Sequence, residues 1–380
     1  MSRWHDSFVL ARLWAVICKE FVQMRRDRLT FAMMVGIPLM QLALFGYAIN
    51  SDPRQLPLAL RAGELTTPVR SLISALQVSD YFVLVAVTAS EAEADQLLER
   101  GEVQFVLSVP AGFERALLRG ERPALLLEAD ATDPAATSNA IAALAEINRL
   151  ALVPDLKGPA AATPSQPPFE LQIHRRYNPA GISQYNIVPG LMGVILTMTL
   201  MLMTALGITR ERERGTLENL LAMPVRPLEV MVGKILPYVV VGYVQVAVIL
   251  LAARYLFAVP FAGSLTLLLA CTLVFILANL TIGIMFSSIA RNQMQAMQMS
   301  FFFFLPSILL SGFMFPYRGM PNWAQAIGEV LPLTHFLRII RGIVLKGNGW
   351  EQVAPHVWPM LLFTLVVLLI GLKRYRRTLD

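Results

Sequence analysis

The sequence predicts a membrane all-α fold with six transmembrane helices and an α/β domain inserted between the first two of them. Of the 380 residues, 56% are hydrophobic and only 15% are charged, whereas soluble domains average about 45–50% apolar and about 25% charged residues. The apolar residues form runs that approach or exceed the roughly 20 residues that a helix needs to cross a bilayer. Residues 50–182 instead show alternating strand and helix patterns, which are typical of a compact α/β domain.

Six apolar runs are the predicted spans, and they cover residues 29–49, 183–209, 235–259, 264–289, 296–315 and 357–372. The last run is shorter than about 20 residues, so we expect its helix to begin earlier or the bilayer to thin there. The first run follows a long polar lead and precedes no A-x-A cleavage site, so we expect an uncleaved anchor and not a signal peptide.

Lysine and arginine residues concentrate in four segments: residues 1–28, residues 210–234, Arg291 and the basic tail 373–380. If six spans alternate in direction, these segments share one side of the membrane, and the positive-inside rule makes that side the cytoplasm. Both termini are then cytoplasmic and residues 50–182 lie outside. The net charge of +6 therefore reflects topology and not nucleic-acid binding, because the basic residues flank apolar runs and 50–182 is acidic on balance.

Residues 1–28 carry apolar side chains at helical spacing, which predicts an amphipathic helix on the inner leaflet, although a soluble helix stays an alternative. The outer domain shows strand patterns at residues 56–60, 81–87, 103–109, 124–128 and 170–174. Helix patterns lie between them at residues 65–78, 90–100, 112–119 and 133–153. Since most of this alternation is complete by residue 153, we expect residues 56–153 to fold alone.

Motifs for covalent chemistry are absent from the sequence. It contains no G-x-x-x-x-G-K-[ST] phosphate loop, no H-E-x-x-H and no G-x-S-x-G, and its four histidines and two cysteines are scattered. We therefore expect no catalytic residue, no metal site and no cofactor in this chain.

The predicted cytoplasmic segment 210–234 begins with alternating charges and continues as a short amphipathic pattern that Pro224 ends. Thr216 can cap this short helix, and its apolar face and charged rim suit the docking of a soluble partner. An ordinary charged loop is the alternative. The candidate docking residues are Arg210, Glu211, Arg212, Glu213, Arg214, Gly215, Thr216, Leu217, Glu218, Leu220 and Leu221.

Residues 321–347 are apolar but are interrupted by charges and by Pro332, so we expect two short re-entrant helices and not a span. Arg338 and Arg341 share a helix face. Glu329, on the preceding short helix, is the nearest candidate partner. We expect these residues to face a polar outer vestibule and not lipid, because exposing a charge to lipid costs at least about 2.5 kcal/mol. Uncharged polar residues within the spans either line a pathway or connect helices, and the candidates are Asn186, Gln245 and Asn279.

The stretch RERERGTLENLLAMPVRPLE at residues 210–229 closely resembles the segment after the second span of ABC-2 type transporter permeases. Two further parts resemble the same family. They are Val103-Gln104 with Pro110 and Phe113 in the outer domain, and Pro332-Leu333-Thr334 followed by Arg341-Gly342 before the last span. The resemblance covers nearly the whole chain and implies the ABC-2 (type V exporter-like) fold with a periplasmic domain.

The resemblance also implies a function. Such permeases sit in the bacterial inner membrane and work as dimers. Each permease binds a cytoplasmic ABC ATPase subunit that holds the ATP and Mg²⁺, so this chain would not be an enzyme itself. Segment 210–229 would contain the coupling helix, and the large outer domain resembles the branch that exports drugs or lipids. We therefore expect an amphipathic or hydrophobic substrate.

The resemblance leaves open whether the dimer is a homodimer or a heterodimer, and whether a periplasmic adaptor takes part. One alternative is a membrane scaffold whose outer domain binds an envelope partner. The other is a secondary transporter, although the sequence shows neither an inverted repeat nor charges in the middle of its spans.

Overall fold

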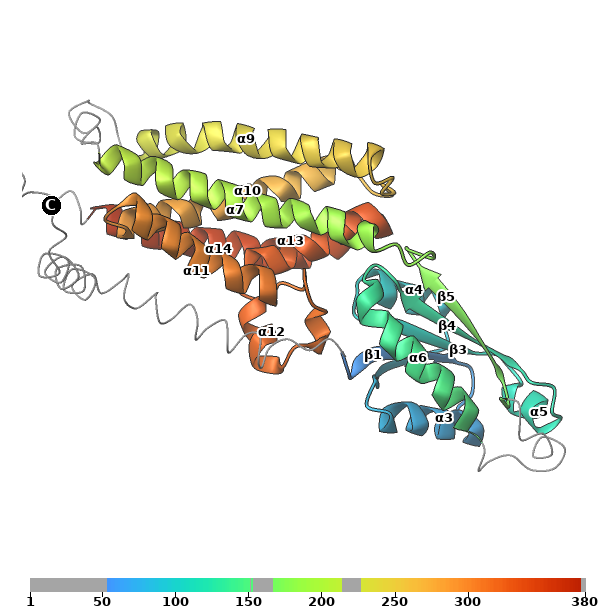
Figure 1. Cartoon of the computed structure of the whole chain (residues 1–380). Helices are drawn as coiled ribbons and strands as arrows, with labels where there is room; N and C mark the ends of the chain where they lie inside the picture. Colours follow the sequence, from blue (N-terminus) through green and yellow to red (C-terminus); the bar gives the residue numbers. More distant parts are fainter. Residues whose placement is uncertain (1–52, 151, 153–166, 214–226, 377–380) are drawn as a thin grey trace, which may run out of the picture.

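The computed structural model describes residues 53–150, 152, 167–213 and 227–376, which form an α/β unit and a helical bundle that meet at one end (Figure 1). The predicted amphipathic helix at 1–28, the first predicted span at 29–49, the basic tail from residue 377 and residues 214–226 lie outside this part.

The α/β unit contains a five-stranded sheet in the order β2-β1-β3-β4-β5. Strand β1 pairs in parallel with β2 and β3, β3 pairs antiparallel with β4, and β4 pairs in parallel with β5. The strands lie where the sequence predicts them and differ only at their ends. They are β1 (Leu56–Ala62), β2 (Phe82–Thr88), β3 (Phe105–Val109), β4 (Ala124–Asp130) and β5 (Glu170–Arg176).

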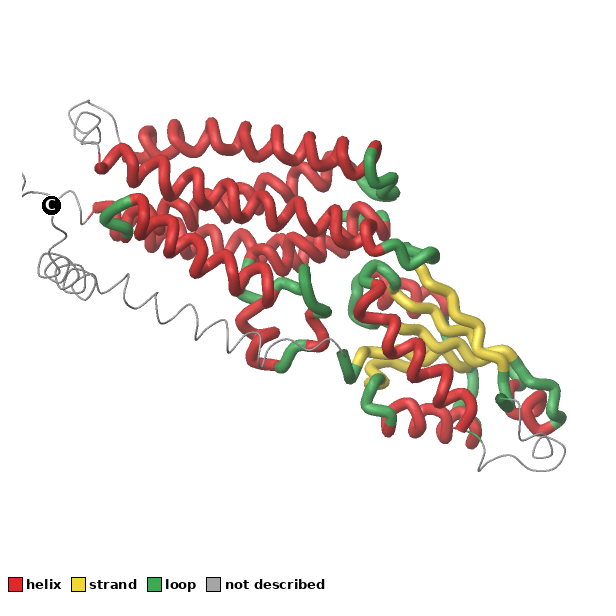
Figure 2. The backbone as a smooth tube through the Cα atoms, viewed as in Figure 1, coloured by secondary structure: helices red, strands yellow, loops and turns green. Residues whose placement is uncertain are grey.

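The predicted helices of this unit are also present, as α3 (Thr67–Val78), α4 (Glu91–Glu99), α5 (Phe113–Leu118) and α6 (Pro134–Leu150). Helices α3 and α6 contribute Leu72 and Leu144 to the larger core on one face of the sheet, and Figure 2 shows α6 crossing the yellow strands. Helix α4 covers the other face with Leu98. The Ser90 hydroxyl caps α4 by accepting the Glu93 N–H at 3.4 Å.

The bundle has four helices in the described residues that are long and apolar enough to cross a membrane, which supports a membrane protein. These spans are Ser183–Glu211 in α7 (Ser183–Glu213), Ile235–Tyr255 in α9 (Pro227–Tyr255), Leu265–Ile289 in α10 (Leu265–Ile289) and Trp350–Gly371 in α14 (Trp350–Arg376). The last helix begins at Trp350 and not at residue 357, which agrees with the first of the two alternatives for the short apolar run.

The predicted fifth span, residues 296–315, corresponds to α11 (Gln293–Leu310), which is not among these four helices. Its first half carries three glutamines, which lower its hydropathy. The chain then leaves the helix at Ser311 and turns at Gly312, whose φ of +83° is the left-handed conformation that glycine adopts readily.

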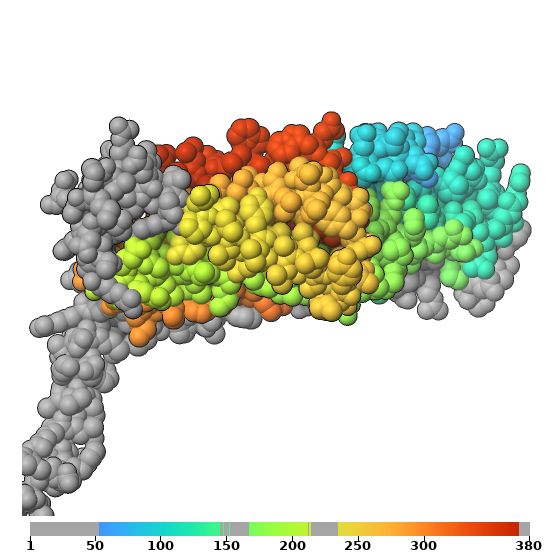
Figure 3. Space-filling model, turned by 90° about the horizontal axis from the view of Figure 1, so that it is seen from above, coloured from blue at the N-terminus to red at the C-terminus, as the bar shows by residue number. Residues whose placement is uncertain are grey.

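Helix α10 is the centre of the bundle and α9 lies at its edge. In their apolar windows, 67% of the residues of α10 are buried but only 11% of those of α9. A Cβ on Gly283 of α10 would lie 2.7 Å from the Met201 carbonyl oxygen of α7, so glycine permits this close approach. Figure 3 shows α9, in yellow, on the outside of the bundle, and its exposed apolar side chains recur at helical spacing: Leu236, Val240, Val244, Val248, Leu251 and Tyr255.

Residues 321–347 form two short helices, α12 (Asn322–Gly328) and α13 (Pro332–Arg341), as predicted, and α13 continues into the π-helical turn η5 (Gly342–Lys346). Pro332 stands at the start of α13, where its missing N–H costs no helical hydrogen bond. Phe336 of α13 stacks on Phe275 of α10, with ring centroids 4.1 Å apart. The apolar face of α13 thereby becomes part of the bundle core.

The fifth strand makes a testable difference, because β5 lies beyond the 56–153 segment that the sequence predicts to fold alone. A fragment of residues 53–178 should unfold cooperatively, since it contains the complete sheet. A fragment of residues 53–160 leaves the edge of β4 unpaired along its whole length and should be less stable or aggregate. Thermal unfolding by circular dichroism and gel filtration compare the two, and equal behaviour would show that β5 is dispensable.

Candidate functional site

A polar cavity of about 460 Å³ lies between the α/β unit and the helices that precede the last span. The α/β unit lines it with the end of α4 and with Gln104, Asp130 and Asp133, while the other wall comes from residues 311–318 and from α13, η5 and α14. Glu329, Arg338 and Arg341, the three residues predicted to face an outer vestibule, all line this cavity. Whether it opens outside the cell stays a prediction.

Glu329 and Arg338 form the predicted ion pair. Two guanidinium nitrogens of Arg338 donate to the two carboxylate oxygens at 2.6 and 3.1 Å, and the Tyr317 hydroxyl donates to the same carboxylate at 2.8 Å. Partial burial raises the pKa of Glu329, but the bonds from Arg338 and Tyr317 outweigh it and leave that pKa below its usual value. The Arg338 guanidinium also lies 4.6 Å from the centre of the Tyr317 ring. Direct hydrogen bonds therefore join Tyr317, Glu329 and Arg338 in this wall of the cavity.

Arg341 does not pair with Glu329, the candidate partner that the sequence suggested. Its Nη1 donates to the Gly312 carbonyl at 3.1 Å instead. Its Nε and Nη2 are buried and have no hydrogen-bond partner within the described residues. The guanidinium of Arg341 is thus held at one nitrogen and unpaired along its other edge.

A buried ion pair joins the two parts of the molecule. The Lys346 ammonium of η5 lies 2.5 Å from Asp130 Oδ2 at the end of β4, and only 8% and 9% of these side chains are exposed. The same ammonium donates to the Leu98 carbonyl at 3.1 Å and lies 5.2 Å from the centre of the Tyr177 ring. Such a pair holds its surroundings firmly, because separating the charges leaves each one buried and unpaired.

The C-terminal end of α4 is the second contact between the two parts. Besides Leu98, the Glu99 carbonyl accepts from Asn348 Nδ2 at 3.2 Å and the Gly101 carbonyl from Arg318 Nη2 at 2.8 Å. The last carbonyls of a helix lack helical partners and carry the negative end of its dipole, so they favour cationic donors. The sequence showed only that Lys346 interrupts an apolar segment, and nothing in it identified these partners.

At the opposite end of the bundle, the described part of the predicted docking segment joins the start of α11. Glu213 accepts from the Gln293 side chain at 2.5 Å and from its backbone N–H at 2.8 Å, and Arg210 donates to Gln293 at 3.4 Å. The bonds from Gln293 lower the pKa of Glu213. Arg210, Glu211, Arg212 and Glu213 end α7, whereas Arg214, Gly215, Thr216, Leu217, Glu218, Leu220 and Leu221 lie outside the described residues.

The three candidate pathway residues lie on three helices and line neither the polar cavity nor the apolar pocket described next. Asn186 is buried on α7. Gln245 of α9 accepts from the Thr199 hydroxyl of α7 at 2.9 Å, and Asn279 donates to the Phe275 carbonyl of its own helix at 2.9 Å. The bond of Gln245 to α7 favours a role in connecting helices, whereas the bond of Asn279 stays within α10 and favours neither interpretation.

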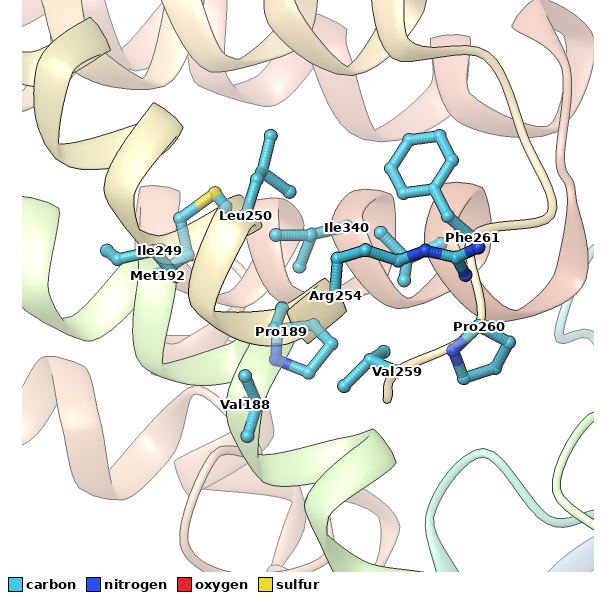
Figure 4. Close-up of a pocket in the computed structure, with 12 residues that line it drawn as sticks. Val188, Pro189, Met192, Ile249, Leu250, Arg254, Val259, Pro260, Phe261 and Ile340 are labelled. Carbon is cyan, nitrogen blue, oxygen red and sulfur yellow. The ribbon is translucent and has the colours of Figure 1, made fainter. Parts of the chain in front are cut away.

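An apolar pocket between α7, α9 and α13 has a volume of only about 30 Å³. Figure 4 shows Pro189 and Met192 of α7 opposite Ile249 and Leu250 of α9, with the Arg254 side chain extended toward Phe261. The space suits a water-sized group, so this pocket does not hold an amphiphile in the conformation observed.

Comparisons with known proteins agree on one family. The family model described as ABC-2 family transporter protein matches residues 28–373. The chain is similar to the probable multidrug ABC transporter permease YbhS of Escherichia coli (strain K12), with 29% identity over 97% of this chain and 98% of that protein. It is 29% identical to the probable multidrug ABC transporter permease YbhR of the same strain, over 93% and 95% of the two chains. The inner membrane transport permease YhhJ of that strain is 30% identical over 77% of this chain and 78% of that protein.

The ion pair between the two parts can be tested with Lys346→Met in the full chain. The substitution leaves Asp130 buried without a counter-charge, so we expect the junction to lose about 3–5 kcal/mol. Hydrogen exchange of residues 98–104 should then rise. Lys346→Met combined with Asp130→Asn should recover part of the protection, because asparagine carries no charge and can still accept the bonds from Thr132.

Arg100→Ala is the matched control. Arg100 follows Leu98 and Glu99 at the end of α4, but its side chain is exposed and forms only a surface ion pair with Glu102, at 3.9 Å. Its exchange should stay near that of the unmodified protein. Unchanged exchange in Lys346→Met would contradict a role for the pair in holding the junction.

Proposed function

Because the chain belongs to the ABC-2 family of transporter proteins, we propose that it forms the transmembrane pathway of an ATP-driven exporter for an amphipathic or hydrophobic compound. The family match across residues 28–373 carries this proposal. The relatives named multidrug permeases support the class of substrate. The four described spans also have uncharged centres, which suits an apolar cargo better than a proton relay.

The six-span topology is part of the proposal. Residues 29–49 are the first span and α11 the fifth, so that the α/β unit lies outside and both termini lie in the cytoplasm of a bacterial cell. Two observations support this orientation. The α/β unit meets one end of the bundle (Figure 1), and Arg210, which bonds to Gln293 next to Arg291, lies at the other end.

The partners follow from the same family assignment. A separate ABC ATPase binds ATP and Mg²⁺ and docks on residues 210–221, a second permease subunit completes the pathway, and this chain hydrolyses nothing. The docking end is mechanically suited to this role, because α7 and α11 are joined there by the bonds of Gln293. A periplasmic adaptor would contact the α/β unit.

The orientation can be tested by cysteine labelling in cells, after Cys18 and Cys271 are replaced. A cysteine in place of Ala92 is exposed on α4, and one in place of Arg291 is exposed between α10 and α11. A membrane-impermeant maleimide added from outside should label the first position and reach the second only after the cells are opened. The reverse pattern would contradict the orientation.

Coupling can be tested by reversing two charges, with Glu213→Lys and Glu218→Lys in one variant. We expect loss of transport and weaker co-purification of the ATPase with unchanged membrane insertion, because the segment lies outside the bilayer and its charges steer docking. Gln293→Ala is the matched control, since it removes the internal bonds of Glu213 but leaves the charges in place. If that control loses the ATPase equally, or the double variant exports normally, residues 210–221 are not the docking element.

A further inference from the structure

The polar cavity contains two guanidinium groups without a carboxylate partner. Lys346 pairs with Asp130 and Arg338 with Glu329. By contrast, Arg318 and Arg341 have no carboxylate within 4.0 Å in the described residues, and each donates to a backbone carbonyl instead. The wall of the cavity therefore holds two guanidinium groups that make no ion-pair contact, although the negative charges of Asp130 and Asp133 act on Arg341 from a greater distance.

Arg341 has the geometry of an anion-binding residue. Its Nη1 is held by Gly312, whose left-handed turn places the carbonyl oxygen. The two unpaired nitrogens, Nε and Nη2, form one edge of the guanidinium and point their N–H groups in parallel. This edge matches the two oxygens of a carboxylate or phosphate, which arginine binds through two parallel hydrogen bonds.

Leaving this edge unpaired is unfavourable, because buried donors without partners lose their bonds to water and gain none in the protein. The edge is covered in the structure while the side chain lines the cavity, so binding of an anion to this edge requires the cavity wall to shift. An anion held there would satisfy both donors.

The surroundings of the cavity indicate that such an anion carries an apolar chain. The cavity lies where α11 ends and the span of α14 begins, and Leu337 and Val353 contribute to its wall. Exposed apolar side chains stand beside its lining residues along the chain, namely Met314, Val330 and Trp350. A head group in the cavity thus has apolar surface within reach of its tail.

We propose that the cavity binds the carboxylate or phosphate group of an amphiphile, with the Nε–Nη2 edge of Arg341 as the main contact. Arg318 adds a second positive charge to the wall. This inference rests on the proposed export function, since it gives the exported compound an anionic head and a binding place at the junction of the two parts.

Binding of octyl phosphate to the purified full chain in zwitterionic nanodiscs, without ATPase, tests the proposal by equilibrium dialysis. We expect saturable binding that Arg341→Lys weakens about tenfold or more, because lysine keeps the charge but not the paired donors. Arg119→Gln is the control, since Arg119 is an exposed arginine of the same α/β unit that lies 3.5 Å from Glu121 and does not line the cavity. That variant should bind within about twofold of the unmodified protein.

Two further measurements are needed. Competition experiments distinguish an amphiphile from a free anion, and thermal unfolding distinguishes a binding role of Arg341 from a structural one. Octyl trimethylammonium should not compete. If inorganic phosphate binds as tightly as octyl phosphate, the ligand is a free anion, and the proposal that the cavity binds an amphiphile is overturned. In Arg341→Met without ligand, Tm should stay level or rise, because the variant removes a buried unpaired charge.

A clear fall in Tm for Arg341→Met would show that the guanidinium is structural and would overturn the site. Absence of octyl phosphate binding, or equal binding in Arg341→Lys, would overturn it as well. The assay uses the permease alone, so a failed ATPase docking test leaves its result intact.

Discussion

The buried pair of Lys346 and Asp130 is the interaction on which the relation of the two parts depends. Both charges have left water, so each is tolerated only while the other stays within bonding distance. Lys346 stands in η5, which continues α13 and packs in the bundle, while Asp130 ends β4, the strand next to the sheet edge formed by β5. The pair therefore fixes how the sheet sits over the bundle, and the polar cavity is the space left beside this contact.

Helix α13 serves both the core and the cavity. Phe336 and Ile340 pack into the bundle, while Arg338 and Arg341 of the same ten-residue helix line the cavity. Rotation of this helix would expose apolar side chains and bury charges at once, so the core packing determines where the arginines point. The Glu329 pair then holds Arg338, and the Gly312 carbonyl holds Arg341, which leaves the cavity lined by fixed and not by freely moving cations.

Local patterns predicted most of the elements, because helix caps, apolar alternation and apolar runs act over short distances. The Ser90 cap and the pairing of Glu329 with Arg338, nine residues apart, are examples. The Lys346–Asp130 pair was not predictable, since its members lie 216 residues apart and only the fold brings them together. Charge suggested Glu329 as the candidate partner of both arginines, but the turn at Gly312 brings a backbone carbonyl to Arg341 instead. The three glutamines of α11 lowered its hydropathy below that of the four helices that are apolar enough to cross a membrane.

Helix α11 links the proposed docking end to the cavity by covalent structure. Its first residue, Gln293, bonds to Glu213 and Arg210, and the turn that follows its last residue presents the Gly312 carbonyl to Arg341. A continuous helix moves as a stiff rod, so a displacement where α7 meets α11 reaches the turn that positions Arg341. Pro306 removes one hydrogen bond of the helix near the cavity end, so any bending of α11 is expected there. The proposed anion site and the proposed docking segment would then contact opposite ends of one helix.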